Sequence, residues 1–235
     1  GNLQAVVELN PQALEQARDS DEARAGGLVR SPLHGIPILI KDNIAAGPEM
    51  HVTAGAAALL DFRPDSEAFL ISALRDAGAV VLGKTNLSEW ANYMSTNLPN
   101  GYSAVGGKTF SPYRDTFDPL GSSTGSAVAA SSNFAAAAIG TETAGSVIAP
   151  AAVNSVVGVH PSLGLVSRGG VIPLSDEMDT AGPLTRTVAD AAILLSALSS
   201  RVDSADRFAP EAASLTGRDF TRFLDRDALR GKRIG

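Results

Sequence analysis

Short apolar runs alternate with polar segments along the first third of the chain, and their spacing predicts both helices and strands. Residues 13–25 are rich in Ala, Glu and Arg and stop at a pair of glycines, which predicts an exposed helix. Residues 36–40 form an apolar run that is followed by polar residues 41–43. This pattern predicts a buried strand with polar side chains at its carboxyl end.

The next segment places a helix before a second strand. Asp65-Ser66-Glu67 indicates a helix start and Gly78 its end, and residues 79–82 predict a buried strand that leads to Lys84. The apolar positions of this helix follow the 3.6-residue period: Phe69, Leu70, Ala73, Leu74 and Ala77. Strand, helix and strand with short connections are typical of an α/β layer fold.

The middle of the chain is rich in turn-forming residues. Residues 97–125 contain three prolines and five glycines, which predicts a long irregular loop, and loops of this length in compact domains are usually functional. The loop ends in a glycine- and serine-rich turn at 121–126. We expect an alanine-rich helix at about 127–138 and a second polar turn at 140–146.

The last third returns to periodic patterns. Residues 163–174 predict a hairpin or a pair of strands around Arg168-Gly169-Gly170. Residues 187–190 resemble a capping box and predict a helix that ends at Leu198. Residues 199–228 predict a polar surface segment, and residues 229–235 predict the start of another strand.

Composition narrows the class of protein. The chain has 235 residues, 44% of them hydrophobic and 19% charged, which is typical of a globular protein and excludes a disordered one. A net charge of −6 without a basic run argues against a nucleic-acid or membrane partner. Cysteine is absent, so disulfides and thiolate chemistry are excluded. No apolar stretch approaches the roughly 20 residues that span a bilayer.

The chain starts at Gly1 without a methionine, and we expect an upstream segment to have been removed. Localisation stays open between the cytoplasm and export after loss of a leader. The oligomeric state is also left open.

Polar residues that are candidates for a catalytic role lie at three points of the chain. Lys41 follows a buried strand, Ser122 and Ser123 lie in a glycine-rich turn, and Ser146 follows small residues in another turn. A serine becomes a nucleophile when a base takes its proton, and a buried lysine can be that base because desolvation lowers its pKa. Plain turns and a surface lysine are the structural alternative for the same residues.

The motifs of the chain resemble those of the amidase signature family in order and without large gaps from about residue 5 to 198. Residues 5–11 and 83–92 are most similar to bacterial peptide amidases within that family. The matching motifs are Leu33 to Pro37 with Lys41 to Asn43, Gly83 to Trp90, Gly121 to Ser126, Gly140 to Ser146, Val157 to Pro161, Asp179 to Pro183 and Arg186 to Asp190.

The resemblance implies a role for each candidate residue. By position, Lys41 matches the catalytic lysine, Ser122 the bridging serine that follows a cis peptide bond, and Ser146 the nucleophile, 24 positions after Ser122. The implied reaction hydrolyses a linear carboxamide through a Ser-Ser-Lys relay and an acyl-enzyme. Gly121 and Ser123 support the relay, and no cofactor or metal is implied.

The resemblance also implies an oxyanion hole and a fold. The backbone N–H groups of Thr143, Ala144, Gly145 and Ser146 are expected to receive the oxyanion. The expected fold is α/β, with a mixed β-sheet wrapped by helices and the glycine-rich loops gathered at the site. We expect residues 1–235 to form the N-terminal portion of one domain, with a catalytic core at about 30–198, because family members are considerably longer.

Three positions depart from the family pattern. Ala144 stands where a glycine is usual, and its left-handed backbone would be strained if the position required φ > 0. His160 stands where lysine is usual, and Ile148 where many relatives carry arginine. The neutral Ile148 favours an uncharged substrate, and we expect a peptide C-terminal amide or a similar hydrophobic amide.

Two other interpretations use different residues or a different role. The sequence Gly121 to Gly125 fits G-x-S-x-G, which would make Ser123 the nucleophile of an α/β-hydrolase with Glu142 and His160. Alternatively, the chain is a non-catalytic or complex-bound homologue, such as an A-type component of an amidotransferase. The remaining candidates are expected to be structural: His34, His51, His160, Glu89, Glu142 and Asp179.

Overall fold

The computed structural model describes residues 2–233, and a mixed six-stranded sheet forms its centre. The strand order is β1 (Val6–Leu9), β3 (Val80–Thr85), β2 (Pro37–Lys41), β6 (Ala137–Glu142), β8 (Thr180–Thr185) and β7 (Val157–Gly158). Strands β3, β2 and β6 are mutually parallel, whereas β1, β8 and β7 join by antiparallel pairing. The predicted mixed α/β fold is confirmed.

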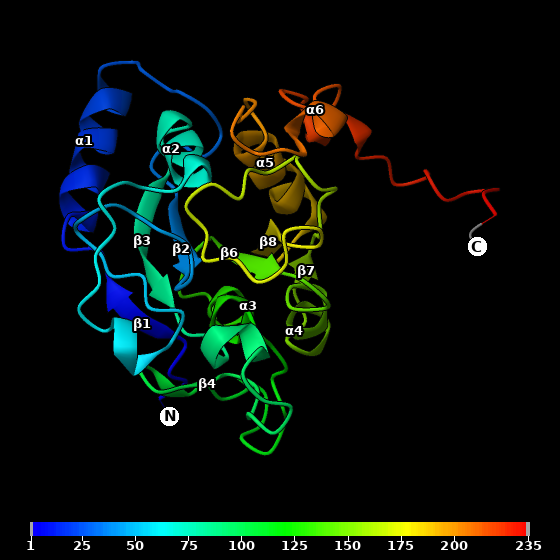
Figure 1. Cartoon of the computed structure of the whole chain (residues 1–235). Coiled ribbons are helices and arrows are strands. Elements are labelled where there is room, and N and C mark those ends of the chain that lie inside the picture. The colour runs from blue at the N-terminus through cyan, green and yellow to red at the C-terminus, as the bar shows by residue number, and fades with distance from the viewer. Residues whose placement is uncertain (1, 234–235) are drawn as a thin grey trace.

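Helices cover both faces of this sheet (Figure 1). The larger helices are α1 (Ala13–Ala25), α2 (Phe69–Asp76), α3 (Thr124–Ser131), α4 (Ile148–Val153) and α5 (Val188–Leu198). Short elements complete the chain: η1 (Ala57–Leu59), η2 (Glu89–Asn92), the hairpin β4 (Tyr102–Ser103) and β5 (Gly107–Lys108), α6 (Ala209–Ala212) and η3 (Phe220–Phe223). No helix among residues 2–233 is long and apolar enough to cross a bilayer.

The sheet separates two hydrophobic cores. One core joins α2 and α5 to Ile38 and Ile40 of β2, and the other joins α3 and α4 to Leu39. Side chains of a strand alternate between the faces, so Lys41 lies on the same face as Leu39, toward α3. The alternation therefore places Lys41 on the side of the sheet where α3 begins at Thr124.

Two predicted helices have different bounds in the structure. Helix α2 begins at Phe69 and not at residue 65, because Glu67 bridges Ala46 and the N–H of Ala68 donates to Ala45 in extended backbone. The alanine-rich helix ends at Ser131, and residues 137–142 form β6. Alanine favours a helix locally, but pairing with both β2 and β8 in the centre of the sheet outweighs that preference.

Three further predictions are wrong or partly wrong. Residues 163–174 form turns and not a hairpin, with one bridge between Val171 and Ile44. The loop at 97–125 contains the small hairpin β4–β5. Residues 229–233 form no strand, and residues 234–235 of that prediction lie outside the described residues.

Other local predictions are confirmed. Helix α1 has the predicted bounds, and only Ala13 in it is buried. Helix α5 begins as a cap, since the hydroxyl oxygen of Thr187 accepts from the N–H of Asp190 at 3.0 Å. The segment after α5 is mostly exposed, although α6 buries Ala209 and Ala212.

Candidate active site

Lys41 is the last residue of β2, and its side chain is completely buried. Its Nζ lies 2.7 Å from Ser122 Oγ and 2.9 Å from Ser123 Oγ. It also lies 3.1 Å from the carbonyl oxygen and 2.9 Å from the Oγ1 of Thr141, which belongs to the adjacent strand β6. The structure thus brings the predicted lysine and the predicted serine pair into one hydrogen-bonded cluster.

Burial changes the protonation of Lys41. Loss of hydration disfavours the ammonium form, and although the carboxylates of Glu142 and Asp179 oppose this effect, the pKa of Lys41 falls to about 7. A substantial fraction of Lys41 is therefore neutral near neutrality. In that form the amine has two N–H donors and one lone pair that accepts a proton.

The hydroxyl of Ser123 is fully engaged by its neighbours. It donates to the carbonyl oxygen of Thr141 at 2.9 Å and accepts from the N–H of Thr141 at 3.2 Å and from Lys41. Because its proton is already held by a carbonyl, Ser123 is poorly placed as a nucleophile. The α/β-hydrolase interpretation also lacks its strand, since residues 117–120 are not in a strand, and His160 is exposed.

Ser122 lies at the start of α3 and is 1% exposed. The peptide bond between Gly121 and Ser122 is cis, as the resemblance implied. The carbonyl of Ser122 accepts from the N–H of Ser88 at 3.1 Å, and a Cβ on Gly121 would stand 2.4 Å from Ser88 Oγ. A side chain at position 121 would therefore displace the Ser88 hydroxyl, and glycine avoids that contact.

Ser146 lies in the loop between β6 and α4, and Glu142 shapes this loop. The Glu142 carboxylate accepts from the N–H of Gly145 at 2.8 Å, from Val147 at 2.5 Å and from Ile148 at 2.8 Å. The carbonyl of Ser146 accepts from the N–H of Ser123 at 3.1 Å, which joins this loop to α3. Within residues 2–233 no hydrogen bond connects the Ser146 hydroxyl to Ser122.

The four backbone N–H groups that were predicted to form the oxyanion hole differ in whether they already donate a hydrogen bond. In the described part of the chain, the N–H groups of Thr143, Ala144 and Ser146 have no hydrogen-bond acceptor, whereas that of Gly145 is held by Glu142. Gly145 has φ of +90°, and Ala144 is not among the residues with positive φ. The alanine at position 144 is therefore accommodated without the strain that a left-handed backbone would bring.

A pocket adjoins this cluster, and its wall is mainly apolar. Thr141 and Thr143 belong to the wall, so the pocket is contiguous with the lysine cluster. The other lining residues are Asn43, Ala54, Trp90, Ala91, Arg168, Val171, Ile172, Pro173, Leu174, Asp179, Thr180 and Ala181. Three of them, Ala54, Trp90 and Ala91, have left-handed backbone conformations.

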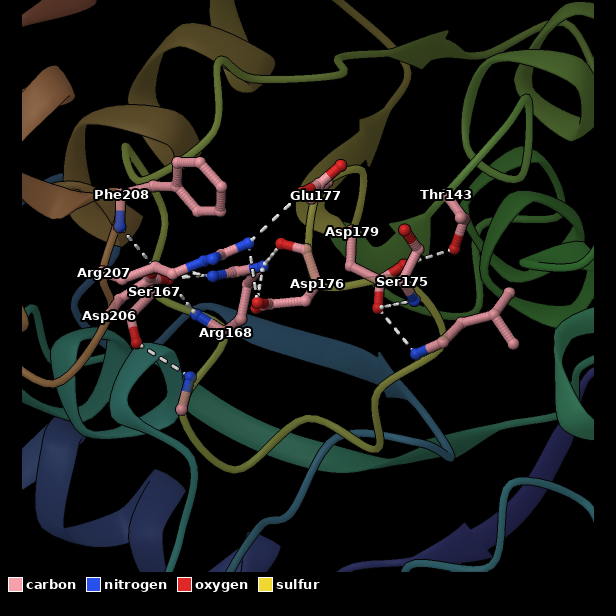
Figure 2. Close-up of polar contacts among 12 residues, drawn as sticks. Thr143, Ser167, Arg168, Ser175, Asp176, Glu177, Asp179, Asp206, Arg207 and Phe208 are labelled. Atoms are coloured by element: carbon pink, nitrogen blue, oxygen red, sulfur yellow. Dashed lines mark hydrogen bonds and ion pairs between the residues drawn. The ribbon is translucent and has the colours of Figure 1, made fainter.

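Asp179 joins the loop between β6 and α4, through Thr143, to the wall of this pocket (Figure 2). One carboxylate oxygen accepts from the hydroxyl of Thr143 at 2.5 Å. The other accepts from the N–H groups of Leu174 and Ser175 at 2.7 and 2.9 Å. Asp179 and Glu142 are thus partners of backbone groups, as predicted.

Arg168 is a second charged group in the wall, and it is paired inside the protein (Figure 2). Its Nε and Nη2 donate to the buried Asp206 at 3.0 and 2.8 Å, and its Nη1 lies 3.3 Å from Asp176. The guanidinium also stacks 5.0 Å from the centre of the Phe208 ring. These contacts hold the segment after α5 against the pocket wall and neutralise the cation.

The three histidines and Glu89 have structural contacts or face solvent, as predicted. His34 accepts from the N–H of Arg30 at 3.1 Å, and His51 pairs with Glu8 at 2.8 Å. Glu89 accepts from the N–H of Ala104 at 2.7 Å. No group of three or more metal-ligating side chains occurs in residues 2–233.

Several site residues were not found from the sequence. Asn43 was seen only as a polar residue at a strand end, Thr141 only as part of a polar turn, and Arg168 only as part of a predicted hairpin or pair of strands. Lys84 was noted only as a residue after a strand; it is completely buried and donates to the carbonyl oxygens of Ile44 and His51 at 2.5 and 3.0 Å. For Asn43 and Lys84, the signal available in the sequence was a polar residue at the end of a buried strand.

A buried lysine at the carboxyl end of a central strand, in contact with serine hydroxyls, is the arrangement found in serine–lysine sites. The family model described as Amidase matches residues 2–235, and the chain belongs to this family, the amidase signature family that its motifs resemble.

Solved structures and curated sequences agree with this assignment. The native peptide amidase from Stenotrophomonas maltophilia is 56% identical with a TM-score of 0.91, over 98% of this chain and 47% of that one. An amidase family protein from Bacillus anthracis is 46% identical with a TM-score of 0.94, over 98% and 45%. The A-type component of a glutamyl-tRNA(Gln) amidotransferase from Persephonella marina is 40% identical, over 98% and 45%. The chain spans 39–46% of the length of three other curated relatives.

Proposed function

We propose that the protein hydrolyses a linear carboxamide to a carboxylate and ammonia, with Ser146 as nucleophile, Ser122 as bridge and Lys41 as base. The observation that carries the proposal is the 2.7 Å contact between Lys41 Nζ and Ser122 Oγ in a buried site. A lysine with a pKa of about 7 exchanges protons with a hydroxyl far more readily than an ordinary lysine.

The proposed steps balance over the whole cycle, because the proton taken from Ser146 leaves with ammonia and a proton from water replaces it. Neutral Lys41 accepts the proton of Ser122 as Ser122 accepts that of Ser146, and the Ser146 oxygen attacks the amide carbonyl. The protonated Lys41 then delivers a proton through Ser122 to the leaving nitrogen, and ammonia departs from an acyl-enzyme. Water repeats the sequence and releases the carboxylate.

This relay requires the Ser146 hydroxyl to turn toward Ser122 when substrate binds. Hydrogen bonds of catalytic groups commonly tighten only in the substrate complex. The contact between the N–H of Ser123 and the carbonyl of Ser146 already holds the two segments together.

The free N–H groups of Thr143, Ala144 and Ser146 support the proposed oxyanion hole. The N–H of Gly145 donates to Glu142, so we assign it the role of shaping the loop. An effective donor of this kind lowers the barrier by about 3 kcal/mol.

The pocket supports an uncharged amide as substrate. Arg168 is paired with Asp206, so it offers no free cation to an anionic substrate group, and both oxygens of the Asp179 carboxylate already accept hydrogen bonds from the protein. The resemblance to the Stenotrophomonas maltophilia peptide amidase favours a peptide C-terminal amide among such substrates. The proposed partner is a small-molecule or peptide amide.

The test is ammonia release from a neutral peptide C-terminal amide by the full gene product that contains this chain. We expect turnover in the wild type and its loss in Ser146→Ala. Equal turnover in both would overturn the assignment of Ser146. Ammonia release only after addition of a co-purifying partner would favour the amidotransferase A-type alternative.

A further inference from the structure

Two buried polar atoms without a hydrogen-bond partner lie in residues that line the candidate substrate pocket. They are the amide Oδ1 of Asn43 and the hydroxyl Oγ1 of Thr180, and neither has a partner within residues 2–233. Asn43 is 5% exposed and Thr180 is 2% exposed. Buried polar groups in folded proteins are almost always paired. Among residues 2–233 the other unpaired atoms of this kind, on Asn92, Ser132 and Asn154, are not in residues that line the pocket, so Asn43 and Thr180 are the two that a ligand there could satisfy.

The side chain of Asn43 is held in place by its other contacts. Its Nδ2 donates to Thr141 Oγ1 at 2.9 Å, and its backbone carbonyl accepts from the N–H of Ile172 at 2.9 Å. The same Thr141 oxygen lies 2.9 Å from Lys41 Nζ. The unpaired Oδ1 is therefore preorganised one hydrogen-bonded residue away from the proposed base.

Thr180 comes from a neighbouring strand at the same edge of the sheet. It begins β8 and stands opposite Glu142 in the register with β6. Its hydroxyl can donate or accept, whereas the Asn43 oxygen can only accept. Together they offer one acceptor and one adaptable hydroxyl to a ligand in this pocket.

The other residues of the pocket wall add no further buried and unpaired polar side-chain group for a ligand within residues 2–233. Arg168 is paired with Asp206, both oxygens of Asp179 accept hydrogen bonds from the protein, and the segment 171–174 is apolar. The apolar wall and the Asn43 acceptor therefore favour an uncharged ligand group that carries an N–H donor. A carboxamide or a peptide group has these properties.

We propose that Asn43 is a specificity-determining residue whose Oδ1 accepts an N–H of the amide substrate, with Thr180 as a second polar contact. The inference rests on the proposed amidase function and adds the groups that select an amide over an ester. The N–H belongs either to the reacting carboxamide or to the preceding peptide bond of the acyl part. Both sources present the same chemistry to Asn43.

The test measures binding, so that it does not depend on turnover. In the full gene product carrying Ser146→Ala, the affinity of an acetylated dipeptide amide is compared with that of its methyl ester and of its depsipeptide analogue. The methyl ester lacks the N–H of the carboxamide, and the depsipeptide lacks the N–H of the inner peptide bond. Each ratio of affinities is then measured again with Asn43→Leu and with Thr180→Val added.

We expect one of the two ratios to favour the amide by at least tenfold in the parent protein and to approach one in Asn43→Leu. The ratio that collapses identifies the source of the N–H. Thr180→Val is expected to weaken amide binding severalfold, and Thr180→Ser, which keeps the hydroxyl, is the matched control. Ratios do not depend on the folded fraction, so partial misfolding of a variant does not imitate the result.

Unchanged ratios in Asn43→Leu would overturn the inference, and so would a parent protein that binds the three ligands equally. Failure of the proposed function has a different signature. If the protein is not an amidase, the wild type releases no ammonia, and the affinity ratio that depends on Asn43 can still be measured.

Discussion

Lys41 Nζ lies 2.7 Å from Ser122 Oγ, although 81 positions separate the two residues in the chain. The contact depends on two local features. The alternation of β2 directs Lys41 toward the face that carries α3, and the turn at Gly121 brings Ser122 to the start of that helix. The proposed chemistry follows from this contact and from the burial of both side chains.

The first prediction concerns pH. Protonated Lys41 cannot accept a proton, so kcat/KM is expected to rise as the pH increases through about 7, the pKa of Lys41 in the folded protein. Measurement of kcat/KM for a neutral peptide amide between pH 5 and 9 checks this, with the pH range chosen to bracket that value at about two units on either side. Lys41→Met is expected to lose activity by about 10³-fold or more across the whole range. A flat profile in the wild type would contradict the assignment of Lys41 as base.

The second prediction concerns Asp179. Its negative charge raises the pKa of Lys41, against the dominant desolvation, so Asp179→Asn is expected to shift the acid limb of kcat/KM to lower pH. Thr143→Val removes the contact with Asp179 but keeps the charge, and its acid limb is expected to stay in place while KM rises. Acid limbs that coincide in wild type and Asp179→Asn would rule out this electrostatic effect.

The third prediction separates the two adjacent serines. Ser122→Ala removes the proposed bridge and is expected to lower kcat by about 10³-fold, whereas Ser123→Ala removes hydrogen bonds that position Lys41 and Thr141. The loss in Ser123→Ala is expected to be smaller and to include a lower melting temperature. Measurement of kcat and of the melting temperature for both variants checks this. A total loss of activity in Ser123→Ala with full activity in Ser122→Ala would reverse their roles.

The fourth prediction concerns folding stability. Burial alone raises the pKa of Asp206, but hydrogen bonds from Arg168 and from the N–H of Phe208 outweigh it and hold the pKa below its ordinary value. A carboxylate with a lowered pKa stabilises the fold above its ordinary pKa, and this contribution is lost as the pH falls through the lower folded value. Arg168→Met leaves Asp206 buried without its cation and is expected to cost about 2–3 kcal/mol of unfolding free energy at neutral pH.

Urea unfolding of Arg168→Met and Asp206→Asn at neutral pH and near pH 3 checks the fourth prediction. The difference between wild type and Asp206→Asn is expected to shrink at the lower pH, because the Asp206 carboxyl of the unfolded chain binds a proton there before that of the folded protein does. A difference of constant size at both pH values would show that the ion pair contributes nothing to stability.

Much of the sheet could be predicted from the sequence because its strands are short apolar runs that end in polar residues. The runs before Lys41 and Lys84 both form parallel strands in the structure. The strand at 137–142 could not be predicted in this way. Its alanines favour a helix, and only their position between β2 and β8 makes them a strand.

The candidate site shows the same division. Lys41 and Ser122 could be found from spacing and resemblance, and the structure brings them together. The contacts of Asn43 with Thr141 and of Arg168 with Asp206 could not be found, because each joins segments that are far apart in the sequence. The local pattern of residues 163–174 suggests a hairpin. In the structure this segment is held instead by contacts outside it, between Leu174 and Asp179 and between Val171 and Ile44.

The central claim is that Ser146 is the nucleophile, and covalent labelling tests it most directly. The full gene product is treated with a fluorophosphonate, which phosphonylates an activated serine, and then cleaved after glutamate. Cleavage at Glu142 separates the fragment 90–142, which holds Ser122 and Ser123, from the fragment 143–177, which holds Ser146. We predict that the added mass lies on 143–177 and disappears in Lys41→Met. Label on 90–142, or label that survives the loss of Lys41, would contradict the proposed mechanism.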